Sequence, residues 1–133
     1  MIHLAGLPPG SRTNRAELAA AAECPEQFLS KVLQNLTRAG LVTSHRGNTG
    51  GFELPRSRRS ASILEVVEAV EGPIRLNLCL TSTHACERQS WCLAHPVWAE
   101  AQQAMVDVLQ KATIGDLAQE AAARREASLL PVT

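Results

Sequence analysis

The sequence has no net charge and no long apolar run. Thirteen Lys and Arg residues are matched by thirteen Asp and Glu residues among 133, which argues against a chain that coats nucleic acid nonspecifically. No apolar stretch approaches the roughly 18 residues that a membrane span requires, and the first residues lack the basic-then-apolar pattern of a secretory signal. A chain of this length can bury one core but not two. We therefore expect one cytoplasmic globular unit with appendages and no membrane partner.

Familiar catalytic motifs are also missing. No glycine-rich phosphate loop follows an expected strand, and the sequence contains no G-x-S-x-G. Cysteine and histidine cluster between residues 79 and 95, but no carboxylate is placed to orient them. A thiol catalyst built on Cys92 and His95 is the remaining enzymatic alternative, and we do not expect an enzyme.

Charge is distributed unevenly along the chain. Residues 1–60 carry eight basic and four acidic side chains, a net charge of +4, whereas residues 61–133 carry five and nine, a net charge of −4. The basic residues between positions 31 and 59, opposed only by Glu53, are Lys31, Arg38, Arg46, Arg56, Arg58 and Arg59. The N-terminal half is therefore the half that could meet phosphate.

Two short helices are expected first. Asn14 is a possible N-cap of an alanine-rich helix that places Leu18, Ala19 and Ala22 on one face. After a break at Glu23 and Cys24, Pro25 lies where a first-turn proline is tolerated. A second helix then repeats Leu29, Val32, Leu33 and Leu36 and ends at Gly40. The pattern predicts a helix-turn-helix unit.

A β-hairpin should follow directly. Apolar Leu41 and Val42 precede "RGNTGG", and Phe52 and Leu54 alternate after it. The residues expected to supply positive φ values in the turn are Gly47, Asn48, Gly50 and Gly51. A hairpin after the second helix makes a winged helix. Ser62 and Glu65 then form a capping box for a helix whose apolar face should close the core and which ends at Gly72.

A long amphipathic helix is expected after the cysteine-rich stretch. Its apolar residues are Val97, Trp98, Ala101, Met105, Val108, Leu109 and Ala112. A helix so far from the core needs a partner, and a second copy would let a two-fold dimer match a two-fold operator. Thr113–Asp116 resembles a cap for a shorter helix that packs back on the dimer.

The expected fold class is mainly α with a small β-hairpin wing, as a winged helix-turn-helix with a long dimerisation helix. The expected parts are a DNA-binding domain (1–76), a cysteine-rich cluster-binding loop (77–95), a dimerisation helix with a C-terminal helix (96–127) and a frayed tail (128–133).

The start of the second helix should enter the major groove of DNA. The candidate base-reading residues are Glu26, Gln27, Ser30 and Lys31. Gln27 can pair with adenine through two hydrogen bonds, and Lys31 can approach guanine. The candidate wing contacts are Arg46, Gly47, Asn48, Thr49 and Gly50, with Arg46 reaching phosphate or a narrow minor groove.

Residues 16–117 resemble the Rrf2 family of winged-helix regulators. The most specific elements are the "LxRAGLVxSxRGxxGGF" stretch and the C-x6-C-x5-C-x2-H segment that ends in "CLAHPVW". The resemblance implies a dimeric transcription factor, often a repressor, that binds a double-stranded DNA operator. It also implies that the operator affinity depends on a bound iron–sulfur cluster, of 2Fe–2S rather than 4Fe–4S type.

The resemblance assigns the cluster ligands to Cys79, Cys86 and Cys92, with His95 as the fourth ligand of the IscR-like branch. Thiolates are the usual ligands of such clusters, and a histidine in place of one raises the reduction potential. The first gap is one residue longer than the family pattern, so His84 is an alternative donor. In the NsrR-like branch the ligand comes from a longer first helix, of which "MIHLAG" resembles only the end.

Other uses of the cysteines stay open. Three cysteines and a histidine also suit a structural zinc site, although zinc ligands more often come in C-x2-4-C pairs. A disulfide would leave an odd thiol, and four cysteines in a reducing compartment favour free thiols or metal ligands. Cys24 is expected to be a small buried hydrophobe. A cluster-free or zinc-bound regulator that senses through thiol chemistry or a small ligand is therefore the alternative function.

Overall fold

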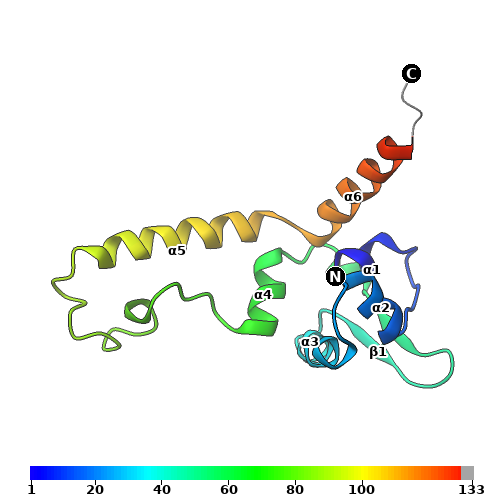
Figure 1. Ribbon diagram of the computed structural model, residues 1–133, viewed down its shortest axis with the longest axis horizontal. Coiled ribbons are helices and arrows are strands. Elements are labelled where there is room, and N and C mark those ends of the chain that lie inside the picture. The colour runs from blue at the N-terminus through cyan, green and yellow to red at the C-terminus, as the bar shows by residue number, and fades with distance from the viewer. Residues whose placement is uncertain (130–133) are drawn as a thin grey trace.

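The computed structural model describes residues 1–129 and is mainly helical, with one two-stranded antiparallel sheet. Figure 1 shows the arrangement. The elements in chain order are α1 (Ile2–Gly6), α2 (Arg15–Ala22), α3 (Glu26–Arg38), β1 (Thr43–His45), β2 (Gly51–Glu53), the short 3-10 turn η1 (Arg56–Arg58), α4 (Ile63–Glu71), the 3-10 turn η2 (Leu78–Leu80), α5 (Ala94–Lys111) and α6 (Ile114–Leu129). Of the expected frayed tail (128–133), Ser128 and Leu129 belong to α6 instead, and residues 130–133 lie outside the described part. The mainly α fold with a hairpin wing is confirmed.

The helix-turn-helix forms where the local signals place it. The Asn14 side chain accepts a hydrogen bond from Glu17 N at 2.9 Å, and Glu17 Oε2 accepts one from Asn14 N at 3.2 Å, which completes a capping box at the start of α2. The helix ends at Glu23, whose φ of 51° turns the chain. Pro25 is the N-cap of α3, one position earlier than expected. Gly40 follows α3 with φ 71°.

The hairpin pairs Thr43 with Glu53 and His45 with Gly51, and its turn spans residues 46–50. A third segment joins it, because Thr13 exchanges two backbone hydrogen bonds with Phe52, at 2.8 and 3.1 Å. The segment around Thr13 therefore lies along the edge of β2 that does not pair with β1.

The turn corrects part of the sequence expectation. Gly47 and Gly51 have positive φ values, of 97° and 133°, but Asn48 and Gly50 do not. Gly50 is needed for space instead, because a Cβ atom there would lie 2.3 Å from the carbonyl oxygen of His45.

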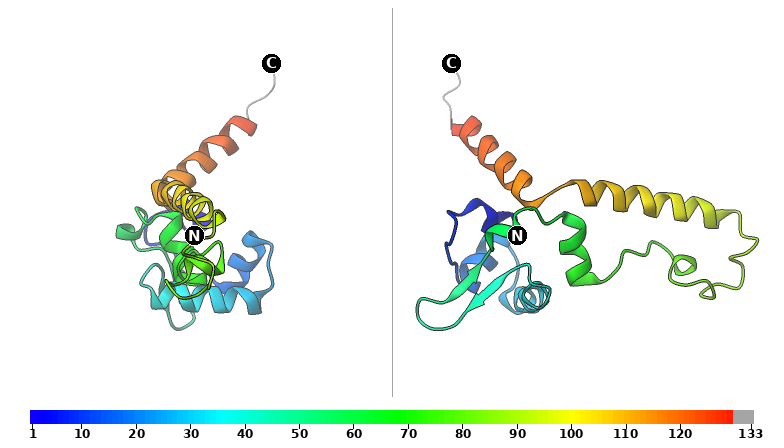
Figure 2. Two further views of the ribbon diagram at one scale, coloured as in Figure 1. Left: turned by 90° about the vertical axis from the view of Figure 1, so that its left-hand side faces the viewer. Right: turned by 180° about the vertical axis from the view of Figure 1, so that it is seen from behind.

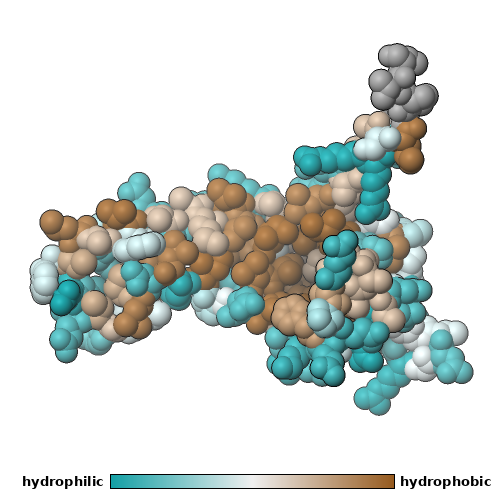
Figure 3. Space-filling view, viewed as in Figure 1, coloured by the Kyte–Doolittle hydropathy of each residue, from teal (hydrophilic) through white to brown (hydrophobic). Residues whose placement is uncertain are grey.

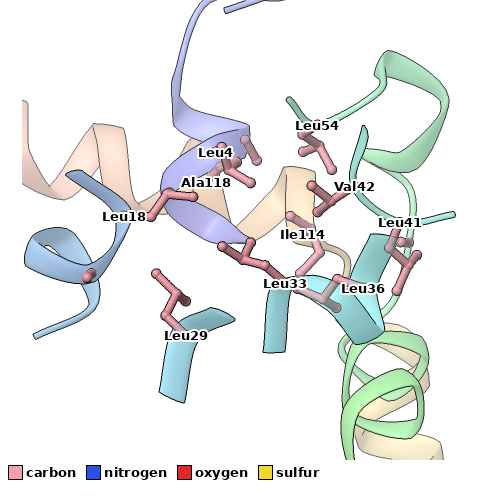
Figure 4. Close-up of a cluster of buried hydrophobic side chains, with 13 residues drawn as sticks. Leu4, Leu18, Leu29, Leu33, Leu36, Leu41, Val42, Leu54, Ile114 and Ala118 are labelled. Atoms are coloured by element: carbon pink, nitrogen blue, oxygen red, sulfur yellow. The ribbon is translucent and has the colours of Figure 1, made fainter. Parts of the chain in front are cut away.

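The core joins both ends of the chain (Figure 4). Leu29, Leu33 and Leu36 of α3 pack with Leu4 of α1 and with Ile114, which is 1% exposed. Ile114 begins α6. In the single chain, the first turns of α6 pack against α1, because Ile114 and nearby Ala118 are part of the same apolar cluster. The expected packing of this helix on the dimer stays a prediction. We call α1–α4 with the hairpin, together with these first turns of α6, the winged domain.

Segment 59–63 anchors the start of α6. Ile63 N donates to Ala112 O at 2.8 Å, Ile114 N donates to Ala61 O at 2.9 Å, and Gly115 N donates to Arg59 O at 2.8 Å. The predicted capping box of Ser62 and Glu65 starts α4 beside this junction. The junction of α5 and α6 is therefore tied by backbone hydrogen bonds to the winged domain.

Helix α5 leads away from the winged domain, and the cysteine-rich stretch lies at its far end (Figures 1 and 2). None of its 18 residues is buried in the described chain. Val97 and Val108 are 65% and 67% exposed, and hydrophobic side chains gather over α5 in Figure 3. The expected long amphipathic helix is present, with its apolar face uncovered in one chain. No helix within residues 1–129 is long and apolar enough to cross a membrane.

Candidate functional site

Helix α3 turns a polar stripe away from the core. The stripe comprises Gln27, Lys31, Gln34 and Arg38, all exposed and spaced four, three and four residues apart. This spacing places them on one helical face, opposite the buried leucines. We call this stripe the outer face of α3. Hydrophilic side chains gather below α3 and over the wing in Figure 3, away from the apolar surface of α5.

Two of the predicted base-reading residues are already engaged in the free chain. Arg15, the first residue of α2, places its Nε atom 3.3 Å from Glu26 Oε2, and one of its terminal nitrogens donates to Ser30 Oγ at 3.2 Å. Ser30 Oγ also donates to the Glu26 carbonyl at 2.9 Å. The Arg15 and Glu26 side chains are both about half exposed, so the ion pair is worth little in water. Its consequence is geometric, because Arg15 orients the side chains of Glu26 and Ser30.

The predicted wing residues form one exposed turn. Arg46, Asn48 and Thr49 are exposed, and Gly50 N donates to Gly47 O at 3.0 Å. Arg12, outside the hairpin, donates to Thr49 O at 3.3 Å and therefore ties the N-terminal segment to the wing tip.

A carboxylate organises the base of the wing. Glu53 Oε2 lies 2.8 Å from His45 Nε2 across the hairpin and 3.9 Å from Arg12 Nε. Glu53, the one acidic residue of the basic stretch, therefore contacts His45 and Arg12 at the base of the hairpin. Arg46, at the exposed turn, has no carboxylate partner within residues 1–129.

A groove of about 390 Å³ runs between α3 and the hairpin. We call it the α3–wing groove. Its lining residues are Arg15, Ser30, Leu33, Gln34, Thr37, Arg38, Ser44 and Phe52. Gln34 and Arg38 belong both to this groove and to the outer face of α3, so the two surfaces are continuous.

One carboxyl group at the start of α2 has a shifted pKa. The pKa of Glu17 is lowered chiefly because Thr13 Oγ1 donates a hydrogen bond to its carboxylate, at 2.6 Å, and further because Asn14 N donates to it. Hydrogen bonds to the charged form favour that form. The capping carboxylate therefore stays ionised below the usual range of glutamate.

The three predicted cluster cysteines lie in the segment that leads into α5. Cys79 is in η2, Cys86 and Cys92 lie in the irregular stretch that follows, and all three are half-buried free thiols. The segment is held to its surroundings by Gln89, whose amide donates to Cys79 O at 3.1 Å, and by Gln102 of α5, which accepts from Leu76 N at 3.0 Å.

His95 lies in the first turn of α5, and its Nδ1 atom is buried without a hydrogen-bond partner in the described chain. Buried polar atoms are nearly always satisfied, so this nitrogen is available to a partner from outside the described chain. Gln89 Oε1, in the same segment, is buried and unpaired as well. The unpaired imidazole nitrogen and the three free thiols suit a thiolate-ligated metal group chemically.

The structure does not gather these ligands. Within residues 1–129, no three His, Cys, Asp or Glu side chains are close enough together to hold a metal ion. The predicted set of Cys79, Cys86, Cys92 and His95 is therefore present in one segment but not convergent. His84, the alternative donor, instead lines a surface depression with Cys86 and Glu87. Cys24 packs partly buried against the core of the winged domain, apart from this segment.

A helix-turn-helix followed by a hairpin, with a polar outer helix face continuous with the wing, defines a winged-helix DNA-binding protein. The model of the Rrf2 family, described as iron-dependent transcriptional regulators, matches residues 1–120. The chain belongs to the Rrf2 family of transcriptional regulators. The family and its structural neighbours are regulators, not enzymes, which confirms the expectation from the missing catalytic motifs.

Individual relatives agree with this assignment. A Mycobacterium tuberculosis protein named as a helix-turn-helix-type transcriptional regulator is 33% identical over 118 residues, which cover 89% of this chain and 73% of the relative. CymR, the global cysteine regulator of B. subtilis, has a similar structure, with a TM-score of 0.69, 27% identity and coverage of 90% of this chain and 87% of that one. IscR of T. potens is similar in fold, with a TM-score of 0.70, 22% identity and coverage of 99% and 84%.

Sequence reasoning missed three residues of this region. Arg15 contacts Glu26 and Ser30, which are 11 and 15 positions away, and no local pattern indicates such a pair. Gln34 could have been found, because it follows Gln27 and Lys31 at helical spacing. Thr37 is distinguished only by the position of its hydroxyl in the α3–wing groove.

Proposed function

We propose that this regulator reads a double-stranded operator with α3 in the major groove and the wing on the flanking backbone or minor groove. The observation that carries the proposal is the exposed outer face of α3, continuous with a basic wing whose acidic residue Glu53 is drawn aside by His45 and Arg12. Gln27 and Lys31 would meet base edges directly. Glu26 and Ser30 would do so in the orientation that Arg15 sets.

The test begins with duplexes that the protein itself selects from a random-sequence pool. We expect the selected duplexes to share a motif. Substitution Arg46→Ala should weaken binding and reduce the slope of log affinity against log salt by about 0.9, the effect of losing one phosphate contact. The substitution Arg125→Ala, on an exposed part of α6, is the matched control. An unchanged slope in the Arg46 variant would remove this side chain from the phosphate contacts.

We further propose that the regulator is a homodimer in which α5 packs against its counterpart. The exposed apolar residues of α5 support this, since a contiguous uncovered apolar face marks an interaction surface. A two-fold dimer would present two copies of α3 to the two half-sites of an operator.

For the signal, we propose that the segment from Cys79 to His95 holds an iron–sulfur cluster, of 2Fe–2S type, whose state changes operator affinity, most simply as a repressor. The unpaired Nδ1 of His95 and three free thiols support this donor set. A bound cluster would supply redox-sensitive chemistry. Because the donors are not convergent in the described chain, binding requires the segment to close. His95 belongs to α5, so closure would be felt by the dimer helix.

Anaerobic purification followed by a visible absorption spectrum and assays of iron, acid-labile sulfide and zinc tests the cluster. We expect coloured protein with iron and sulfide, and loss of colour in Cys86→Ala and Cys92→Ala but not in the control Cys24→Ala. The pair His95→Ala and His84→Ala identifies the fourth ligand. Colourless protein after anaerobic reconstitution would exclude the cluster.

A second candidate is regulation without a cluster. CymR, at 27% identity, is a cysteine regulator, and the three thiols of this chain's cysteine-rich segment are half-buried and free of disulfides. Under this alternative, the cysteine-rich segment senses through thiol chemistry, a small ligand or bound zinc. Stoichiometric zinc, or operator binding that responds to thiol oxidation in metal-free protein, would support it.

A further inference from the structure

We propose that the α3–wing groove is a subsite for the deoxyribose–phosphate backbone of one DNA strand, with Arg38 and the Thr37 hydroxyl holding a phosphate. The proposal rests on the proposed function, since it concerns the same DNA complex. It adds a binding site for the strand between the major-groove helix and the wing.

Charge complementarity is the first support. Arg15 and Arg38 both line the groove, and no acidic residue of the described chain does. Arg15 is partly neutralised by Glu26, whereas Arg38 donates only to the neutral Asn35 amide, at 3.2 Å. Its positive charge is therefore available to an anion that enters the groove.

The chemistry of the lining is the second support. Ser30, Thr37 and Ser44 contribute hydroxyl groups, while Leu33 and Phe52 contribute apolar surface. A sugar–phosphate strand alternates anionic oxygens with a largely apolar ring, and this lining offers donors for the first and contact surface for the second.

Thr37 supplies the third support. Its Oγ1 atom is buried, and no hydrogen-bond partner exists for it within residues 1–129. A buried hydroxyl without a partner in the protein can be satisfied by a ligand that enters the groove. A phosphate oxygen in the groove would accept a hydrogen bond from this hydroxyl.

Continuity with the outer face of α3 is the fourth support. Gln34 and Arg38 extend the line of Gln27 and Lys31 into the groove, so a duplex seated on those two residues would carry its backbone along the lining. A strand that reaches the wing at Arg46 has to cross this region.

The experiment measures affinity at several salt concentrations for a duplex that the wild-type chain selects from a random pool. We expect Arg38→Gln to reduce the salt slope by about 0.9, and Arg125→Gln to leave it unchanged. Thr37→Val should weaken binding about threefold to tenfold at unchanged slope, without lowering thermal stability, because it removes a neutral donor that is unpaired in the free chain.

A second measurement locates the phosphate. Single methylphosphonate substitutions along each strand remove one charge at a time. One position should weaken the wild-type complex and have no further effect on the Arg38→Gln complex. If Arg38→Gln and Thr37→Val both bind as Arg125→Gln does, the subsite is overturned while DNA recognition stands. If the wild-type chain selects no duplex, the proposed function itself fails.

Discussion

At the scale of single residues, the carboxylate of Glu17 joins the start of the helix-turn-helix to the segment that braces the wing. Thr13, whose backbone pairs with Phe52, also donates its hydroxyl to this carboxylate. The lowered pKa of Glu17 has a defined sign for stability. Its contribution is complete above the pKa of the unfolded chain and is lost as the pH falls through the lower folded pKa.

Removing that hydroxyl should move the titration. In Thr13→Val we expect the pKa of Glu17 to rise toward its ordinary value, because its largest stabilising hydrogen bond is gone. The pH dependence of stability on the acid side should weaken in parallel. Side-chain NMR titration of the Glu17 carboxyl measures the shift. Thr43→Val, the same change at an exposed strand position, should leave the lowered pKa of Glu17 unchanged. An equal rise of this pKa in both variants would show that the Thr13 hydroxyl is not the cause.

At the scale of elements, the first turn of α6 is an internal part of the winged domain. Ile114 is 1% exposed among residues of α1 and α3. We expect Ile114→Ala to lower the free energy of unfolding by about 2–5 kcal/mol, through lost burial and the cavity left behind. Denaturant titration measures this loss of unfolding free energy, and the m-value should be unchanged. Leu129→Ala, at the exposed end of the same helix, should cost little, and equal small losses in both variants would place α6 outside the core.

Most elements could be predicted because their causes are local. The capping boxes at Asn14 and Ser62 and the leucine spacing of α3 are each contained within a few residues of sequence. The docking of Ile114 could not be predicted, because Leu4 and the buried leucines of α3 lie 78 to 110 positions earlier in the chain. The turn shows the same limit, since the need for Gly50 comes from the carbonyl of His45 and not from a positive φ.

The candidate site divides in the same way. The face that carries Gln27 and Lys31 follows from helical period and charge. The Arg15 contacts to Glu26 and Ser30 depend on how α2 crosses α3, which no spacing encodes. For the cysteines, spacing identifies a donor set, but whether the thiols converge depends on the conformation of an irregular segment.

At the scale of the whole molecule, α5 lies between the cysteine-rich segment and the winged domain, and its junction with α6 is hydrogen-bonded to the winged domain. The N-terminal end of α5 lies beside the cysteine-rich segment. The junction after its C-terminal end is tied to segment 59–63 by the backbone hydrogen bonds of Ile63, Ile114 and Gly115. A displacement of α5 would therefore pull on the backbone just before α4 (Figure 2). In the proposed dimer, a signal received near Cys92 would have this route to the two copies of α3.

This coupling between the cysteine-rich segment and α3 requires that α5 form the dimer interface. One charged substitution in α5 tests that requirement. Val108 is 67% exposed in one chain, so Val108→Glu should not unfold the winged domain. In a dimer whose apolar α5 faces meet, the same carboxylate would be buried without a partner, at a cost sufficient to dissociate it. We expect Val108→Glu to sediment as a monomer at concentrations where wild type is dimeric, and to bind a two-half-site operator at least tenfold more weakly. Gln110→Glu adds the same charge on the opposite face of α5 and should remain a dimer. Dimeric Val108→Glu would place the interface elsewhere, and the coupling of the cysteine-rich segment to DNA would then need another path.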